Sequence, residues 1–381
     1  MNVVDHSTVL SFSGNGLPTD KHSLQGSVIS LGQAIVDVSM QIDAIPNPGE
    51  NLFADHSQTV AGGCGFNVLY AARAMGARAS LGSALGSGPW ADVLKNALSQ
   101  NDIEHTGMNL KGEDSGFCVA LTDKCAERTF ISTRGAECHV PKAAFDKIHP
   151  SGNDVVHLSG FTLVSDTAAA LLSFLGRTRQ QRFTAVFDVS PVIGEVDSAT
   201  LERMVEYRPI WTCNESEADL LACRMGMVKD HPAKDSFDKT AKTSSSQYRF
   251  SSIFERYSRL AQALNAPLVV HCGSKGAWLC LPGFPPQLIP AFPAQAVDTN
   301  GAGDCHTGVL CVSLLMGGSL REAVSLANLA ASISVESRGA ATCPPLLRIV
   351  SDVHFKEALL CDDTRSLLDR LSSKEQQEGK L

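Results

Sequence analysis

The sequence lacks the features that mark several large classes of protein. Positive charge is in deficit, because 32 Lys and Arg stand against 40 Asp and Glu and leave a net charge of −8. We therefore expect neither nucleic acid nor an anionic membrane as a partner. No apolar run reaches the roughly 20 residues that a membrane helix requires. The N-terminal residues lack the basic and apolar regions of a signal peptide, which predicts a cytoplasmic protein.

Other absences concern cofactors. The 12 cysteines never occur as C-x-x-C pairs, so a zinc site of the usual spacing is not expected. Several cysteines lie inside apolar runs, as is typical of small buried side chains in a reducing compartment. The G-x-x-x-x-G-K-[ST] motif is also missing, which disfavours a P-loop kinase. A composition of 44% hydrophobic and 19% charged residues indicates a globular enzyme with one large domain.

From Val28 onwards, short apolar runs alternate with amphipathic stretches, and this alternation indicates the fold class. We expect strands over 28–37, 154–158, 184–188, 210–213 and 267–272, and helices that include 66–75 and 166–175. Strands that alternate with helices predict an α/β fold with a mostly parallel sheet covered on both faces.

Two stretches, about 47–60 and 113–136, break the alternation. In the second, apolar runs over 117–121 and 128–132 flank a polar turn, which is the pattern of a β-hairpin. Residues 228–250 are polar without apolar spacing and indicate a surface insertion. The expected organisation is a flexible tail over 1–26, one domain over 27–371 and a charged tail over 372–381.

The sequence Gly301-Ala302-Gly303-Asp304 precedes an apolar run and predicts a loop that opens a buried helix. Small residues let the backbone approach a ligand, and the first N–H groups of a helix have no partner within it. Such a helix start attracts phosphate, and Asp304 is then a candidate base beside the phosphate. An acidic residue that only complements the helix dipole would fit the same pattern.

Three further positions carry polar chemistry. Asp37 is expected at the carboxyl end of the first strand, where ligands of α/β sheets gather, although it could also be a turn residue. The block Gly62-Gly63-Cys64-Gly65-Phe66-Asn67 combines glycines with an amide that can both donate and accept, or it is the structural start of a helix. Asn214 followed by Glu217 forms a capping pattern.

The blocks over 62–77 and 298–304, roughly 230 residues apart, resemble the two signatures of the ribokinase-like (PfkB) carbohydrate kinases. The resemblance extends from about residue 28 to 345. It implies a ribokinase-like fold with a small β-sheet lid, formed by the strands about 47–60 and 113–136, over the sugar site. It also implies transfer of the γ-phosphate of ATP to a hydroxyl of a small carbohydrate.

The resemblance assigns a role to each motif. The catalytic residues would be Asp304 as general base and the Gly301, Ala302 and Gly303 amides as anion hole. The sugar contacts would be Asp37, Gly62, Gly63 and Asn67. The cofactor contacts would be Asn214, Gly273, Ser274, Gly276 and Asn328 for ATP, Glu217 for Mg²⁺ through water, and Asp298 and Asn300, with backbone from 334–340, for a monovalent cation such as K⁺. His271 and Cys272 stand where the family often has Thr and Leu, so the nucleotide loop departs from the common pattern.

Alternatives stay open at this stage. A nucleoside kinase has the same signatures, and a catalytically weak regulator that binds sugar or nucleotide would share the fold. Loss of the base or of the anion hole would mark the regulator, and both are present in the sequence. The exposed edges of a small lid sheet invite pairing with a second copy, which predicts a homodimer through the lid. The sequence does not specify which hydroxyl of which sugar or nucleoside is the acceptor.

Overall fold

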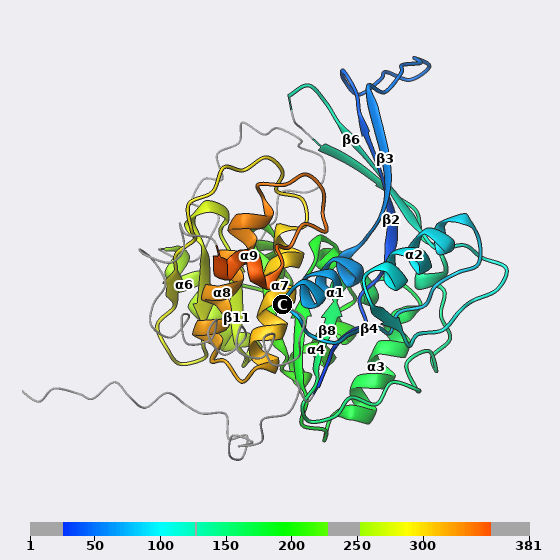
Figure 1. The fold of residues 1–381 in the computed structure, drawn as a ribbon. Helices are drawn as coiled ribbons and strands as arrows, with labels where there is room; N and C mark the ends of the chain where they lie inside the picture. The colour runs from blue at the N-terminus through cyan, green and yellow to red at the C-terminus, as the bar shows by residue number, and fades with distance from the viewer. Residues whose placement is uncertain (1–25, 126–127, 228–251, 352–381) are drawn as a thin grey trace, which may run out of the picture.

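The computed structural model describes residues 26–125, 128–227 and 252–351 (Figure 1). The predicted insertion over 228–250, the C-terminal tail and all but the last residue of the N-terminal tail lie outside the described residues. None of the helices in the described ranges is long and apolar enough to cross a membrane.

A nine-stranded sheet forms the centre of the described chain, in the order β13-β12-β11-β10-β9-β8-β1-β4-β5. Pairing is parallel from β11 to β5, and β12 and β13 join antiparallel. The central strands are buried on both faces and therefore read as continuous apolar runs. The strands are β1 (Val28–Ser30), β4 (Ala79–Leu81), β5 (Ile103–His105), β8 (Val155–Ser159), β9 (Thr184–Asp188), β10 (Ile210–Asn214), β11 (Leu268–His271), β12 (Ala277–Cys280) and β13 (Gln287–Ile289).

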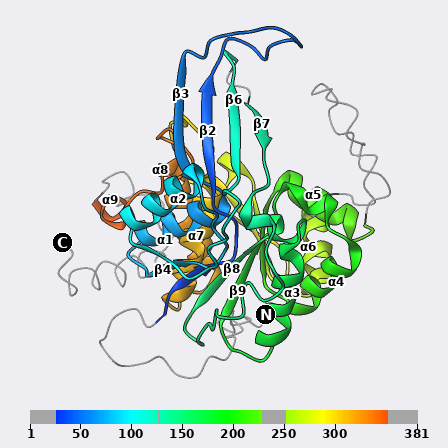
Figure 2. The same cartoon turned by 90° about the vertical axis from the view of Figure 1, so that its right-hand side faces the viewer.

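Helices cover both faces of this sheet, and a hydrophobic cluster lies on each side (Figure 2). One face carries α1 (Cys64–Ala74), α2 (Pro89–Gln100), α7 (Ala302–Leu315), α8 (Leu320–Ser334) and α9 (Leu346–Ser351). The other carries α3 (Thr167–Thr178), α4 (Ser198–Tyr207), α5 (Glu215–Arg224) and α6 (Ile253–Leu264). Short 3₁₀ turns occur at η1 (Ala136–Cys138), η2 (Gly160–Leu163), η3 (Pro191–Glu195) and η5 (Gly273–Lys275). The predicted α/β class is confirmed.

Four strands form a second sheet that projects from the body, which we call the lid (Figures 1 and 2). Their order is β3-β2-β6-β7, in which β2 pairs antiparallel with β3 and parallel with β6. They are β2 (Ile35–Gln41), β3 (His56–Gly62), β6 (Phe117–Thr122) and β7 (Arg128–Ser132). The predicted hairpin over 117–132 is confirmed. Within the expected lid stretch of about 47–60 the strand begins only at His56, and the lid also contains β2, which the sequence did not assign to it.

The expected single strand over 28–37 is wrong. The chain forms β1, breaks at 31–34, and enters the lid as β2. The strand breaks where the chain packs against the start of α1, and there the Gly65 amide donates to the Gln33 carbonyl at 2.8 Å. A Cβ on Gly65 would lie 2.3 Å from the Gly32 carbonyl oxygen, so the two backbones touch. Asp37 is therefore the third residue of a lid strand and not the end of β1.

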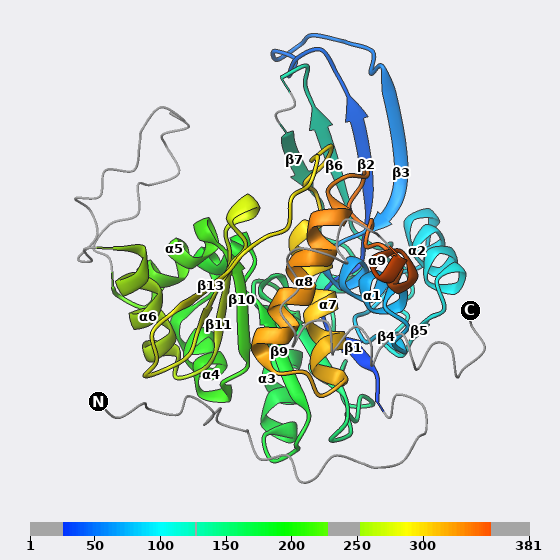
Figure 3. The same ribbon diagram turned by 60° about the vertical axis from the view of Figure 1, so that its left-hand side comes forward.

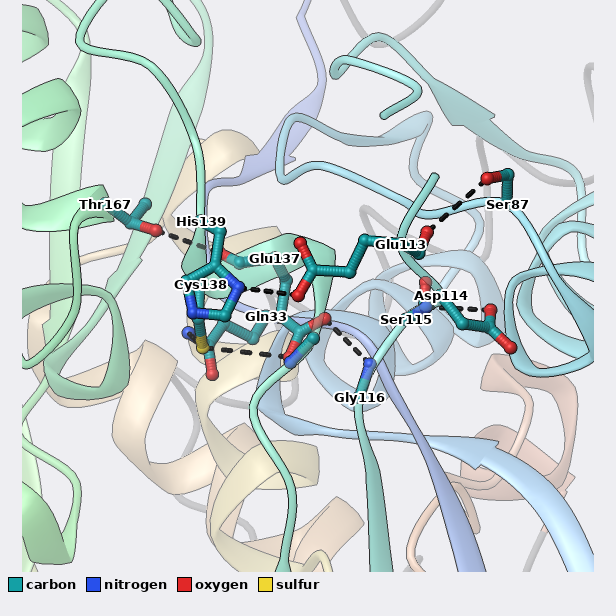
Figure 4. A network of polar contacts seen from close by, with 11 residues as sticks. Gln33, Ser87, Glu113, Asp114, Ser115, Gly116, Glu137, Cys138, His139 and Thr167 are labelled. Carbon is teal, nitrogen blue, oxygen red and sulfur yellow. Dashed lines mark hydrogen bonds and ion pairs between the residues drawn. The ribbon is translucent and has the colours of Figure 1, made fainter. Parts of the chain in front are cut away.

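The base of the lid is held by a buried carboxylate (Figure 4). Glu137, only 1% exposed, accepts the amides of Gly116 and Gly135, each at 2.9 Å. Gly116 precedes β6 and Gly135 follows β7, so one side chain joins the points where this hairpin leaves and re-enters the body. Thr167 Oγ1 in turn donates to the Glu137 carbonyl at 2.8 Å and connects this base to α3.

Candidate active site

The start of α7 lies where the lid meets the body. Its N-cap, Gly301, has φ 71°, and a Cβ there would lie 2.0 Å from the Ala340 carbonyl oxygen. Only glycine fits both the left-handed backbone and that close approach. The Cys305 amide makes the first helical bond, to the Gly301 carbonyl at 2.8 Å. Of the three predicted anion-hole amides, that of Ala302 already donates a hydrogen bond, to the Thr299 carbonyl. At 3.3 Å this hydrogen bond is long.

Asp304, in the first turn of α7, faces α1. Asn67 Nδ2 donates to Asp304 Oδ2 at 2.7 Å across 237 residues of sequence. Burial raises the pKa of Asp304 to about 6, and the hydrogen bond from Asn67 only partly opposes that rise. Among the described residues no hydrogen-bond partner reaches Asn67 Oδ1, although this atom is buried. Asn67 Oδ1 is therefore a hydrogen-bond acceptor without a partner among the described residues, next to the Asp304 carboxylate, whose pKa is about 6.

Asp37 brings a second carboxylate from the lid. A Cβ on Gly62, at the end of β3, would lie 2.1 Å from Asp37 Oδ2, so the glycine makes room for this side chain. Burial, and then the charge of Asp304, raise the pKa of Asp37 to about 6. Asp37, Gly62, Asn67 and Asp304, which the sequence assigns to one site, are thus brought together by four separate elements of the fold, β2, β3, α1 and α7.

Two more acidic residues lie near the ends of β9 and β10: Asp188 ends β9, and Glu217 is in the first turn of α5, which follows β10. Asn214 and Glu217 form the predicted capping box, in which each side chain accepts the other's amide at 2.9 Å. Burial and the charge of Asp304 keep the pKa of Glu217 above its usual value, against the pull of the Asn214 amide. The capping interpretation is confirmed, and the cap places a buried carboxylate close enough to Asp304 for their charges to interact.

Sequence reasoning missed Asp188, the last residue of β9. Burial, followed by the charges of Glu217 and Asp304, raises the pKa of Asp188 well above its usual range. The next turn is strained, because Ser190 has φ 62°, and the Ser190 amide donates to Asp188 Oδ1 at 3.1 Å. The available signal was the one used for Asp37, a carboxylate at the end of an apolar run.

Four of the five predicted nucleotide residues lie around η5 and β13, while Asn214 is at the end of β10. Gly276 has φ 104°, and a Cβ there would lie 2.1 Å from the Ile289 carbonyl oxygen. Asn328 Nδ2 donates to the carbonyls of Ile289 and Pro290, at 2.9 and 3.1 Å. Gly276 and Asn328 therefore hold the same short segment, while Gly273, at φ 54°, and Ser274 form the open 3₁₀ turn after β11.

His271, at the end of β11, lies beside the anion-hole residues. Its Nδ1 is 3.7 Å from the position of a Cβ on Gly303, and its Nε2 is hydrogen-bonded to Thr212 Oγ1 at 3.0 Å. Its ring packs against that of His306 at a tilt of 51°, with 4.2 Å between centroids. Burial lowers the pKa of His271 to about 4 and also lowers that of His306. Both rings are therefore neutral near pH 7, and the His306 side chain, on α7, is buried.

The predicted cation loop is tied together by direct hydrogen bonds. Asp298 accepts the Asn300 amide at 2.8 Å and the Gly339 amide at 3.0 Å. The Val335 carbonyl accepts the amides of Val297 and Asp298. Asp298 also forms an ion pair of 2.6 Å with Arg128, the first residue of lid strand β7, which sequence reasoning did not single out.

Comparisons with known proteins agree with this architecture. A model of the pfkB family of carbohydrate kinases matches residues 25–347. An uncharacterised sugar kinase of Escherichia coli K12, YegV, is 30% identical over 318 residues, covering 84% of this chain and 91% of that protein. The structure of Arabidopsis thaliana ribokinase with ribose and ATP has a TM-score of 0.67 at 21% identity and covers 87% of this chain and 99% of that one.

A nucleoside kinase of Burkholderia thailandensis, solved in complex with inosine, has a TM-score of 0.63 at 18% identity, covering 93% of this chain and 97% of that one. At such identities the two solved structures establish the ribokinase-like fold alone. The family model spans most of the chain, and the blocks over 62–77 and 298–304 meet through the hydrogen bond between Asn67 and Asp304. The chain therefore belongs to the pfkB family of carbohydrate kinases, which are phosphotransferases acting on a sugar hydroxyl.

Proposed function

We propose that this protein is an ATP-dependent kinase of a small carbohydrate, with Asp304 as its general base. The observation that carries the proposal is the hydrogen bond between Asn67 and Asp304 at the start of α7, beside the lid residue Asp37. A carboxylate with a pKa of about 6 is ionised at neutral pH and remains basic enough to accept a hydroxyl proton.

In the proposed reaction the acceptor hydroxyl lies between Asp37, Asn67 and Asp304. Asp37 and Asn67 Oδ1 accept hydrogen bonds from sugar hydroxyls and orient the ring. The reacting oxygen attacks the γ-phosphorus while its proton passes to Asp304, and the bond from the γ-phosphorus to the bridging oxygen breaks to release ADP. The amides of Gly301 and Gly303, at the positive end of α7, would stabilise the charge on the transferred group.

Magnesium fits the acidic group at the ends of β9 and β10. The charge of Asp304 raises the pKa of both Glu217 and Asp188, the charge of Glu217 also raises that of Asp188, and a divalent cation would relieve this repulsion. Glu217 uses Oε2 in its cap, so Oε1 would hold the ion through water. Within the described residues no three His, Cys, Asp or Glu side chains are arranged to bind a metal directly, which suits an ion that keeps several waters. Bound together with ATP, Mg²⁺ would offset the charge of the phosphates.

Two further proposals complete the assignment. The intact base and glycines disfavour a regulator without activity.

The lid carries exposed apolar side chains, among them Phe130 and Ile131 on β7, 54% and 59% exposed, and we propose that two copies pair through them. An apolar surface of this kind at a sheet edge is a ready site for strand-to-strand contact.

A coupled ADP-release screen over free sugars, sugar acids and nucleosides tests the function, with Asp304→Asn as the blank. We expect sustained ADP release with a free sugar and none above background in the variant. A preference for nucleosides would instead establish the nucleoside kinase of the same fold, represented by the Burkholderia thailandensis relative. Absence of turnover with every acceptor would overturn the assignment.

A further inference from the structure

We propose that Arg128 is a built-in cation of the anion-hole loop, standing at Asp298 where a monovalent cation would otherwise bind, so that catalysis by this protein does not depend on K⁺. The proposal rests on the proposed kinase function for its activity test but not for its binding test. It makes Arg128 a positioning residue that acts through Asp298.

The first step is that two of the predicted cation ligands, the Asp298 carboxylate and the Val335 carbonyl, already accept several hydrogen bonds. Asp298 Oδ1 accepts both Arg128 Nη2, at 2.6 Å, and the Asn300 amide, at 2.8 Å. Asp298 Oδ2 accepts the Gly339 amide at 3.0 Å. The Val335 carbonyl, across the same junction, accepts two amides, at 2.8 and 3.0 Å. These oxygens already have hydrogen-bond donors, so a bare cation would have to displace several of them.

The second step is charge balance. The Asp298 side chain is 11% exposed and that of Arg128 27% exposed, so this pair lies in a partly buried place. The Asp298 carboxylate accepts hydrogen bonds from the Gly339 and Asn300 amides and from the Arg128 guanidinium. One negative charge is thus matched by one positive charge, and a second cation would be left uncompensated where desolvation is costly.

The third step connects this pair to the reaction. Asp298 holds the Asn300 amide, and the next residue, Gly301, rests against the Ala340 carbonyl and opens α7. The segment before α7 rises beside the lid, where β7 begins with Arg128 (Figure 3). One ion pair therefore connects the lid, which carries Asp37, to the loop that carries the anion hole. Removal of the guanidinium would free both the lid and the loop.

The chain offers a matched control. Lys124 also carries a positive charge on the lid and forms an ion pair of 2.6 Å with Asp43, but both side chains are 68% exposed. Lys124→Met removes a lid cation without touching the junction, whereas Arg128→Met removes the one at Asp298 and keeps a side chain of similar length. Arg128→Lys restores the charge without the planar fork of the guanidinium.

The experiment compares these four proteins in KCl, NaCl and tetramethylammonium chloride at equal ionic strength, by kcat and by melting temperature. We expect wild type and Lys124→Met to show the same kcat and Tm in all three salts, within about twofold and a degree or two. Arg128→Met should lose about tenfold or more in kcat, with part of the loss recovered in Arg128→Lys. In Arg128→Met alone, K⁺ should raise Tm above its value in tetramethylammonium.

Two results would overturn the proposal. One is a wild-type protein whose Tm or kcat rises strongly and specifically with K⁺, since that would show a cation binding beside Arg128. The other is an Arg128→Met protein that matches Lys124→Met in every salt. A wild-type protein without activity towards any acceptor would refute the kinase assignment instead, and the melting temperatures would still decide the role of Arg128.

Discussion

Replacement of Asp304 by Asn separates catalysis from folding, because the two effects have opposite signs. The amide keeps the shape of the side chain and can still accept from Asn67, which lies 2.7 Å from Asp304 Oδ2. It cannot take a proton, so we expect kcat to fall by roughly 10²- to 10⁴-fold, the usual contribution of a general base. That loss corresponds to about 3–5 kcal/mol of transition-state stabilisation.

Stability should change the other way. The pKa of Asp304 rises from 3.8 to about 6 on folding, so the ionised side chain is less favourable in the folded than in the unfolded chain. A shift of about two units is worth at most about 3 kcal/mol, and the partial exposure of the side chain reduces that figure. The free energy of unfolding of wild type should therefore fall as pH rises from about 4 to 6. Above pH 6 the Asn variant should be the more stable protein.

The assays are ADP release and urea unfolding at pH 5 and pH 8, with Asp92→Asn as control. Asp92 is an exposed acid in the first turn of α2, so its loss tests the helix-dipole effect alone. The control should lose no more than about 1 kcal/mol of stability and none of its turnover. Near-wild-type turnover in Asp304→Asn would remove Asp304 from the role of base. A variant that is inactive and also less stable at pH 8 would show that Asp304 is structural.

Three further predictions address its neighbours. Asp37 and Asp304 both have pKa values of about 6 and both must be ionised, so kcat/KM should fall steeply as pH drops through 6. Asp37→Asn should reduce the slope of log kcat/KM against pH to about one and should raise KM for the sugar. An unchanged slope and an unchanged KM would exclude Asp37 from the site. Glu217→Gln should raise the Mg²⁺ concentration needed for half-maximal rate, whereas a lower Tm with an unchanged Mg²⁺ titration would leave only the capping role. Sedimentation should show a dimer that Phe130→Ser converts to monomer, and a wild-type monomer at micromolar concentration would contradict pairing through the lid.

The sequence by itself determined the fold class and the chemistry of the motifs, because both depend on local pattern. Strands covered on both faces read as apolar runs, and the expected strand over 184–188 matches β9 residue for residue. The capping box at Asn214 is likewise visible in four consecutive residues, since its two hydrogen bonds span a single helical turn. The Gly-Ala-Gly-Asp turn predicts a helix start for the same reason.

Only the tertiary structure decided how these pieces meet. Gly32 is the one local sign of a break in the stretch from Val28, and it is the contact of Gly32 and Gln33 with the start of α1 that ends β1 and directs Asp37 into the lid. Asp188 joins the acidic group because β9 and β10 end side by side, and Arg128 meets Asp298 across 170 residues. Such contacts follow from the packing of distant segments, which periodicity along the chain does not record.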